Sequence, residues 1–129
     1  MQPRKVRADG SVPAAGWLNL DLGGPNPGKL WNLRLANIVP DPVTTTLVGV
    51  ALLIVGTVPR GTDIPSPADV QDWTDVFPNV GPWSRGTIYV EPGNHLGISF
   101  LGTPVAAEVI GTANIEEFDA SDAPILGLD

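Results

Sequence analysis

Residues 88–101, IYVEPGNHLGISFL, contain two apolar segments joined by a four-residue turn. Pro92 presets the first corner of this turn, and Gly93 accepts the positive φ of the second corner. Apolar residues alternate along both segments: Ile88 and Val90 before the turn, and Leu96, Ile98 and Phe100 after it. Alternation with a period of two residues is typical of half-buried β-strands. The stretch therefore predicts two strands and the tight turn between them.

Glycine and proline, the residues typical of such turns, occur along the whole chain. Its 129 residues include 15 glycines and 14 prolines, which divide the sequence into short apolar runs and leave no room for a long helix. Strands are predicted at residues 16–22, 30–38, 44–55, 86–90, 95–101 and 105–112, with a short edge strand at 115–118 and a further strand near 5–8. Many short strands separated by turns predict an all-β fold, namely a two-sheet antiparallel β-sandwich of jelly-roll-like type.

Two of these strands carry further detail. Trp31, Leu33 and Leu35 alternate with polar residues, so these three apolar side chains are expected to share one face of their strand. Residues 44–55 are apolar on both faces, which indicates a central strand of the sandwich.

Residues 56–82 form the longest stretch without a strand pattern and are expected to be one long, irregular loop. Ser66, Pro67 and Asp69 match the start of a helix. Serine suits the N-cap, proline suits the first turn, and an acidic residue suits the positive end of the helix dipole. This helix is expected to end near Trp73. A loop of this length is usually functional.

The chain is expected to form one domain with an extension at each end. Residues 1–15 contain two prolines and no usable periodicity, which predicts an extended N-terminal arm. The β-sandwich is predicted to span residues 16–118. Six acidic residues lie between residues 108 and 129, and residues 119–129 are predicted to form an acidic C-terminal tail.

Composition limits the classes of partner. The net charge of −7 argues against nucleic acid, because proteins that bind it are usually basic. The longest apolar run, residues 47–55, is too short to cross a bilayer as a helix, so no membrane partner is expected. The chain has no cysteine, which excludes disulfides, thiol nucleophiles and zinc–thiolate sites. No apolar segment follows the first charged residues, so synthesis in the cytoplasm without a secretory signal is expected.

Residue types that serve catalysis are scarce. His95, the only histidine, follows the turn at residues 91–94 and is interpreted as a surface residue. No serine lies in the strand–turn–helix setting of a nucleophile elbow. Two pairs of nearby carboxylates are interpreted as solvated charges and not as the paired acids of a glycosidase: Asp72 with Asp75, and Glu116 with Glu117. The acidic residues of the long loop match no calcium-ligand spacing. The sequence therefore predicts neither an enzyme nor a cofactor.

Aromatic residues in and after the long loop allow two interpretations. Trp73, Trp83 and Tyr89 would form a platform for a sugar ring, and Asp72 and Asp75 would bond to its hydroxyl groups. The alternative is that these rings only hold the long loop against the sheets.

Basic residues gather at the start of the chain. Arg4, Lys5 and Arg7 surround Val6, and no basic residue follows Arg85. The simplest interpretation is a solvated terminus. The alternative is an assembly interface, in which this segment pairs with the edge strand of a neighbouring subunit and its charges meet an acidic surface. Removal of residues 1–15 would then leave a folded monomer that no longer assembles.

Three stretches of the chain carry a family resemblance. They are LWNLRL at residues 30–35, IYVEPGNHLGI at residues 88–98, and VIGTA at residues 109–113 with EEF at residues 116–118. In this pattern, which covers roughly residues 16–118, the chain resembles small β-sandwich accessory proteins of tailed-bacteriophage virions. The resemblance implies a multi-copy decoration, neck or tail component without enzymatic activity. It does not account for the loop at residues 56–82.

The expected function is that of a non-enzymatic structural protein, located in a tailed-phage virion after synthesis in the host cytoplasm. It is expected to be a homo-oligomer and to bind virion structural proteins on a repetitive capsid, neck or tail surface, as a decoration or cement protein does. The N-terminal arm and the sandwich edges would make these contacts. The alternative is a carbohydrate-binding or host-recognition module of a tail fibre or baseplate, which would use the aromatic platform.

Overall fold

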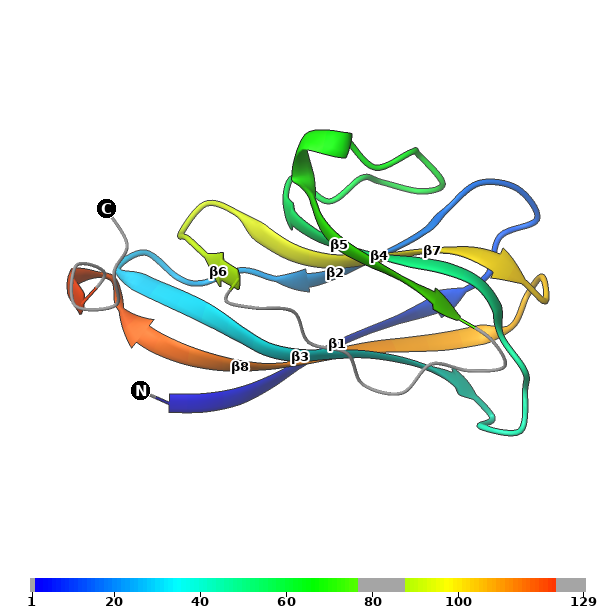
Figure 1. Ribbon diagram of the computed structural model, residues 1–129, viewed down its shortest axis with the longest axis horizontal. Coiled ribbons are helices and arrows are strands. Elements are labelled where there is room, and N and C mark those ends of the chain that lie inside the picture. The colour runs from blue at the N-terminus through cyan, green and yellow to red at the C-terminus, as the bar shows by residue number, and fades with distance from the viewer. Residues whose placement is uncertain (1, 77–87, 123–129) are drawn as a thin grey trace.

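The computed structural model describes residues 2–76 and 88–122 of the chain. Within these residues the strands form two antiparallel sheets of four strands each, packed face to face (Figure 1). The strands are β1 (Gln2–Ser11), β2 (Leu18–Gly23), β3 (Lys29–Asp41), β4 (Val48–Gly56), β5 (Val70–Val76), β6 (Ile88–Val90), β7 (His95–Thr103) and β8 (Glu108–Asp119). There are also two short 3₁₀ helices in this part of the chain, η1 (Pro67–Asp69) and η2 (Ala120–Asp122).

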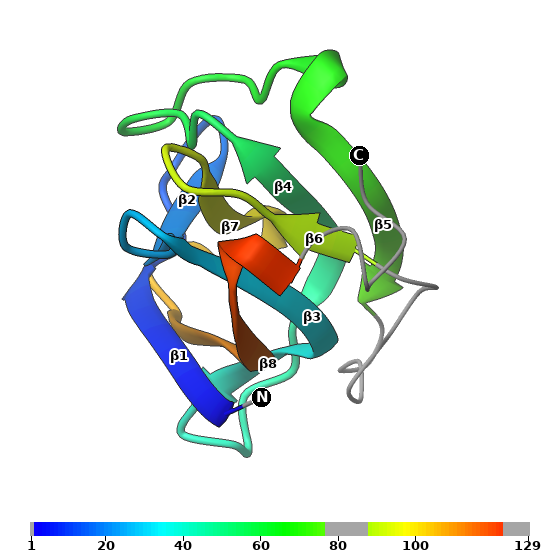
Figure 2. The same ribbon diagram turned by 90° about the vertical axis from the view of Figure 1, so that its left-hand side faces the viewer.

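The strand order is that of a jelly roll. The first sheet has the order β1-β8-β3-β6, and the second sheet has the order β2-β7-β4-β5. Successive strands lie in different sheets, except for β4 and β5, which pair with each other. This connectivity pairs β1 with β8, β2 with β7 and β3 with β6, as two nested Greek keys require. The predicted two-sheet antiparallel sandwich is confirmed. Viewed from its end, the sandwich has β1 and β2 on one side and β5 on the other (Figure 2).

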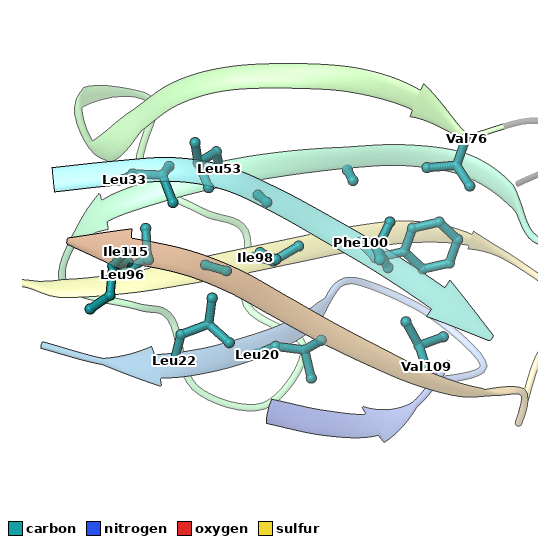
Figure 3. Packing of buried hydrophobic residues seen from close by; sticks show 14 of the residues in the cluster. Leu20, Leu22, Leu33, Leu53, Val76, Leu96, Ile98, Phe100, Val109 and Ile115 are labelled. Carbon is teal, nitrogen blue, oxygen red and sulfur yellow. The ribbon is translucent and has the colours of Figure 1, made fainter. Parts of the chain in front are cut away.

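The hydrophobic core lies between the two sheets (Figure 3). The predicted inward residues of β7, Leu96, Ile98 and Phe100, are completely buried there. The strand β4 lies between β7 and β5, as predicted for a central strand, and contributes Ala51 and Leu53 to the core. Burial of a large apolar side chain stabilises the folded state by roughly 1.5–3 kcal/mol. The core therefore explains why the alternating pattern identified these strands.

A β-bulge in β3 changes one predicted face. Trp31 and Leu33 point into the core, as expected. The register between β3 and β8 then shifts between Leu33 and Leu35, which leaves Arg34 as an extra residue. The prediction that Leu35 shares the inward face is therefore wrong. Beyond the bulge, the inward positions are occupied by two other apolar residues, Ala36 and Ile38.

The N-terminal segment is part of the sandwich. All ten residues of β1 pair with β8 of the same chain, and two of them, Val6 and Ala8, pack against the core. The sandwich therefore begins with β1 and not at residue 16. The expectation that removal of residues 1–15 leaves a folded monomer is not compatible with this pairing. Without β1, β8 would lose its hydrogen-bonded partner on one side, and the core would lose its contacts with Val6 and Ala8.

The strand β8 joins two segments that the sequence pattern separated. Residues 105–112 and 115–118 were expected to form one strand and one short edge strand. Instead, residues from Glu108 to Asp119 form a single strand between β1 and β3, so the predicted edge strand is wrong. The strand extends into the predicted acidic tail, and η2 follows it. The remainder of that tail, residues 123–129, lies outside the described residues.

The predicted helix is confirmed only at its start. Pro67 is the first residue of η1 and follows Ser66, although the Ser66 side chain makes no capping hydrogen bond. The helix ends at Asp69, and the residues up to Val76 form β5 instead of the predicted helix to Trp73. The β-branched residues of this segment suit a strand, and the segment pairs with the apolar strand β4. Tertiary pairing thus overrides a valid local helix start.

Candidate functional site

The strand β1 is an edge of the first sheet. Its only hydrogen-bonded strand partner among the described residues is β8, and the strand that packs near it from the second sheet, β2, does not pair with it. It carries three basic side chains, Arg4, Lys5 and Arg7, and one acidic side chain, Asp9. The chain as a whole has a net charge of −7, so this edge is basic within an acidic protein.

Two of the four predicted interface residues are engaged within the sandwich. Val6 packs against the core. The Arg4 Nη1 donates to Glu117 Oε2 at 2.9 Å, and the Arg4 guanidinium lies 5.6 Å from the centroid of the Trp31 ring. The Trp31 Nε1–H donates to the same Glu117 oxygen at 3.0 Å. Arg4 and Val6 therefore fix β1 to the sandwich and do not point away from it.

Hydrogen bonds also set the ionisation of Glu117. The indole N–H of Trp31 lowers the pKa of Glu117 below its ordinary value of 4.5, and the hydrogen bond and charge of Arg4 lower it further. Burial of the carboxylate acts in the opposite direction but does not reverse the shift. Glu117 is therefore held in its charged form where β1, β3 and β8 meet.

The other two predicted interface residues face the outside of the first sheet. Arg7 lies 3.5 Å from Asp9, and both side chains are exposed. Lys5 forms no ion pair with the described residues, and it lines a groove of about 490 Å³ between β1, β8 and β3. In the same groove, the Arg34 Nε lies 3.2 Å from Glu116 Oε1. The predicted basic surface thus reduces to Lys5 and Arg7.

The predicted aromatic platform is not brought together by the described residues. Trp73 is 59% exposed on the outer face of β5, and Asp75 shares that face. Asp72 is buried and lies opposite the core residue Leu53, so it points into the sandwich. Tyr89 lies on β6, in the other sheet. Trp83 lies outside the described residues.

Trp73 lies instead beside aliphatic side chains of the second sheet. Its cross-strand neighbour on β4 is Leu52, and the next outward residue of β4, Val50, lies opposite Leu101 of β7. Leu101 is exposed although it is a large apolar residue. We call Val50, Leu52, Trp73 and Leu101 the outer apolar patch. Exposed aliphatic and aromatic side chains of this kind often mark a surface that contacts another molecule.

A polar cleft on the outer face of the second sheet was missed by the sequence analysis. It has a volume of about 480 Å³ and is lined by Asn19, Asp21, Gly56, Thr57, Val58, Pro59, Arg60, Gly61, Gly93 and His95. The Nδ1 of His95 lies 2.9 and 3.0 Å from the two carboxylate oxygens of Asp21. These residues are 74 positions apart, and only the pairing of β2 with β7 brings them together. No local spacing in the sequence signals this contact. His95 itself is exposed, as predicted.

Comparisons with protein-family models, with curated proteins and with solved structures give no match for this chain. The described residues contain no group of three or more His, Asp or Glu side chains placed to hold a metal ion. In the same part of the chain, no helix has the length and apolar character needed to cross a membrane. Functional inference therefore depends on the two surfaces and the cleft described above.

Proposed function

We propose that this chain is a non-enzymatic structural protein of a tailed-phage virion, which binds a repetitive capsid, neck or tail surface through the edge strand β1. The observation that carries this proposal is that β1 is ten residues long, basic, and hydrogen-bonded to a strand on one side only among the described residues. Its location in the virion would follow synthesis in the host cytoplasm.

Strand addition is the mode of binding that such an edge permits. An edge strand presents unpaired backbone N–H and C=O groups, and an extended segment of a partner protein satisfies them by extending the sheet. Lys5 and Arg7 flank this edge on the outer face of the first sheet. Their charges favour a partner segment with acidic residues, and they discriminate against basic ones. A second copy of this chain, which has a net charge of −7, would pair through an acidic segment and not through its own basic β1.

Charged residues on an edge strand also have a protective role, since they prevent unwanted pairing. The two roles make different predictions for charge reversal. A charge that only prevents unwanted strand pairing does so with either sign. A charge that attracts an acidic partner repels that partner when its sign is reversed. The Lys5→Glu, Arg7→Glu double variant therefore separates docking from protection without changing a core residue.

The fold is compatible with this role by analogy. Eight-stranded jelly rolls occur in viral capsid proteins and also in lectins. An analogy of fold does not by itself establish function, so the edge strand β1 and its charge carry the proposal. The resemblance in residues 30–35 and 88–98 favours the virion over other assemblies.

The test is incorporation into phage particles. Particles are purified from cells that produce either the wild-type chain or the Lys5→Glu, Arg7→Glu variant, and the chain is quantified in them by mass spectrometry. We expect many copies of the wild-type chain per particle. The variant should remain in the soluble fraction, and its circular dichroism spectrum should match that of the wild type, which would show that it is folded. Arg60→Glu, a charge reversal in the loop between β4 and η1, is the matched control and should incorporate normally. Absence of the wild-type chain from particles, or equal incorporation of the double variant, would contradict the proposal.

Carbohydrate binding is the second candidate function, and the exposure of Trp73 favours it. The ring is 59% exposed and shares its face of β5 with the exposed Asp75, so a sugar ring has both an aromatic face and a hydrogen-bond acceptor available. A glycan array decides between the two candidates. Specific retention that Trp73→Ala abolishes would support carbohydrate binding. A silent array together with incorporation into particles would exclude it in favour of assembly.

A further inference from the structure

The cleft on the second sheet has a wall that is fixed by hydrogen bonds. The amide Nδ2 of Asn19 donates to the carbonyl oxygens of Gly61 and Asp63, both at 3.1 Å. The Oδ1 of Asn19 accepts a hydrogen bond from the buried Ser99 hydroxyl at 2.6 Å. One side chain thus joins the segment at residues 57–63 to β2 and β7. The cleft is therefore preformed and does not require a ligand to assemble it.

Packing under this segment explains a glycine in β7. A Cβ atom added to Gly97 would lie 2.6 Å from Val58 Cγ2, so Val58 rests directly on the backbone of the sheet. The N–H of Thr57 also donates to the carboxylate of Asp69 at 3.3 Å. These contacts hold the start of the segment, and those of Asn19 hold its end.

The His95 ring has a defined orientation in this cleft. Asp21 Oδ1 accepts the backbone N–H of Gly23 at 2.8 Å, so the carboxylate is fixed from a second side. Because the Nδ1 of His95 faces Asp21, its Nε2 is the ring nitrogen left for a ligand. That nitrogen accepts a hydrogen bond from a hydroxyl group when the ring is neutral, and donates one when the ring is protonated.

Two charged side chains line the cleft, and Arg60 is the one that attracts an anion, since the carboxylate of Asp21 faces the Nδ1 of His95. The other described basic residues, Lys5 excepted, each lie within 4 Å of a carboxylate, whereas Arg60 forms no ion pair with the described residues. It lines the cleft together with His95 and Asp21. A free guanidinium binds a planar carboxylate or a phosphate through two parallel hydrogen bonds. Arg60 is thus available to bind the carboxylate or phosphate group of a ligand.

We propose that this cleft binds a small hydroxylated anion, with its anionic group on Arg60 and a hydroxyl group on the Nε2 of His95. The volume of about 480 Å³ lies within the range of small-molecule sites. The anionic group could come from two sources, the carboxylate of a sugar acid or the phosphate of a phosphorylated sugar. The proposal is independent of the proposed function, because the cleft lies on the second sheet and shares no residue with β1.

The test is a titration of the isotopically labelled wild-type chain, followed by amide and histidine NMR signals. The probes are D-glucuronate, D-glucose 6-phosphate and neutral D-glucose, each at equal ionic strength. We expect the anions to shift the signals of Gly61, Gly93 and His95, and D-glucose to leave them unchanged. Arg60→Gln should weaken binding of the effective anion by about tenfold or more, the usual effect of losing a hydrogen bond to a charged group. His95→Gln should weaken it as well, because the second contact is lost.

Lys5→Gln is the matched control, because Lys5 is the other described base without an ion pair but lies on the first sheet. It should bind the anions as the wild type does. A response to D-glucuronate alone would identify a carboxylate site, and a response to D-glucose 6-phosphate alone a phosphate site. Three results would overturn the proposal: no shift in the cleft with either anion, equal binding by Arg60→Gln, or an equal effect of D-glucose. None of these results bears on incorporation into particles.

Discussion

The guanidinium of Arg4 lies 5.6 Å from the centroid of the Trp31 indole ring, and both side chains donate to the same carboxylate oxygen of Glu117. Three strands meet in this arrangement, since Arg4 belongs to β1, Trp31 to β3 and Glu117 to β8. The Arg4–Trp31 contact therefore crosses β8 and links the edge of the sheet to its interior. It adds a side-chain contact to the backbone pairing with β8 that holds this charged segment against the sandwich.

Replacement of Arg4 by methionine should weaken the fold modestly. Arg4→Met keeps an unbranched apolar stem but removes the cation–π contact and the ion pair with Glu117. Together these are worth about 1 kcal/mol at a partly exposed site. Urea denaturation of the wild type and the variant measures the difference. The control is Arg7→Met, whose exposed contact with Asp9 at 3.5 Å should be worth less than about 0.5 kcal/mol. Equal losses in the two variants would show that the contacts of Arg4 with Trp31 and Glu117 together contribute no more than one exposed ion pair.

Deletion of residues 2–11 should prevent stable folding. The deletion exposes one side of β8 and removes the side chains of Val6 and Ala8, which pack against the core. It also removes Arg4, whose guanidinium lies over the Trp31 ring. Circular dichroism and urea denaturation of the truncated chain provide the measurement, with a loss of cooperative unfolding as the expected result. A truncated chain that unfolds cooperatively at the wild-type urea concentration would restore the view of residues 1–15 as a dispensable arm.

Sequence patterns predicted the fold well where local alternation and burial agree. The turn with Pro92 and Gly93 lies between two strands, β6 and β7, as expected, and β7 supplies the inward residues Leu96 and Ile98. The all-β class and the two-sheet antiparallel sandwich followed from these repeated short strands, whereas the strand order did not. The period of two residues is a direct consequence of strand geometry, so such elements can be found without knowledge of their partners.

Other features depend on partners and were not predictable from local pattern. The bulge at Arg34 is a property of the pairing between β3 and β8, and it reversed the face of Leu35. β5 forms because its residues pair with β4, although Pro67 begins a helix directly before it. The contact between Asp21 and His95 joins residues far apart in the sequence. Each of these requires the register of a sheet, which a single sequence does not specify.

Acid should destabilise the wild type more than Glu117→Gln. The folded state lowers the pKa of Glu117 below its ordinary value of 4.5, so the ionised carboxylate stabilises the fold at pH values above 4.5. This contribution is lost as the pH falls through the folded-state pKa. The free-energy difference between wild type and variant, measured by urea denaturation, should therefore be present at neutral pH and disappear in acid. Lys29 also lowers the pKa of Asp119, so the variant should keep a weaker acid dependence. A difference that is constant with pH would contradict the shift.

Substitution of Asn19 should loosen the cleft and also weaken the fold. Asn19→Ala removes both hydrogen bonds to the segment at residues 57–63 and leaves the hydroxyl of Ser99, which is completely buried, without its acceptor. An unsatisfied buried polar group costs about 1–3 kcal/mol, so the variant should lose stability in this range. Hydrogen exchange should become faster at the amides of residues 57–63, because their link to β2 is lost.

The double variant Asn19→Ala, Ser99→Ala separates the two effects of this substitution. Removing the Ser99 hydroxyl also removes the unsatisfied group, so part of the lost stability should return, while hydrogen exchange at residues 57–63 stays fast. If Asn19 holds the cleft as its contacts indicate, the double variant should be more stable than Asn19→Ala. Hydrogen exchange at residues 57–63 should be equally fast in the two variants. Slow exchange in both variants would show that Val58 on Gly97 and the Thr57–Asp69 bond suffice to fix the wall.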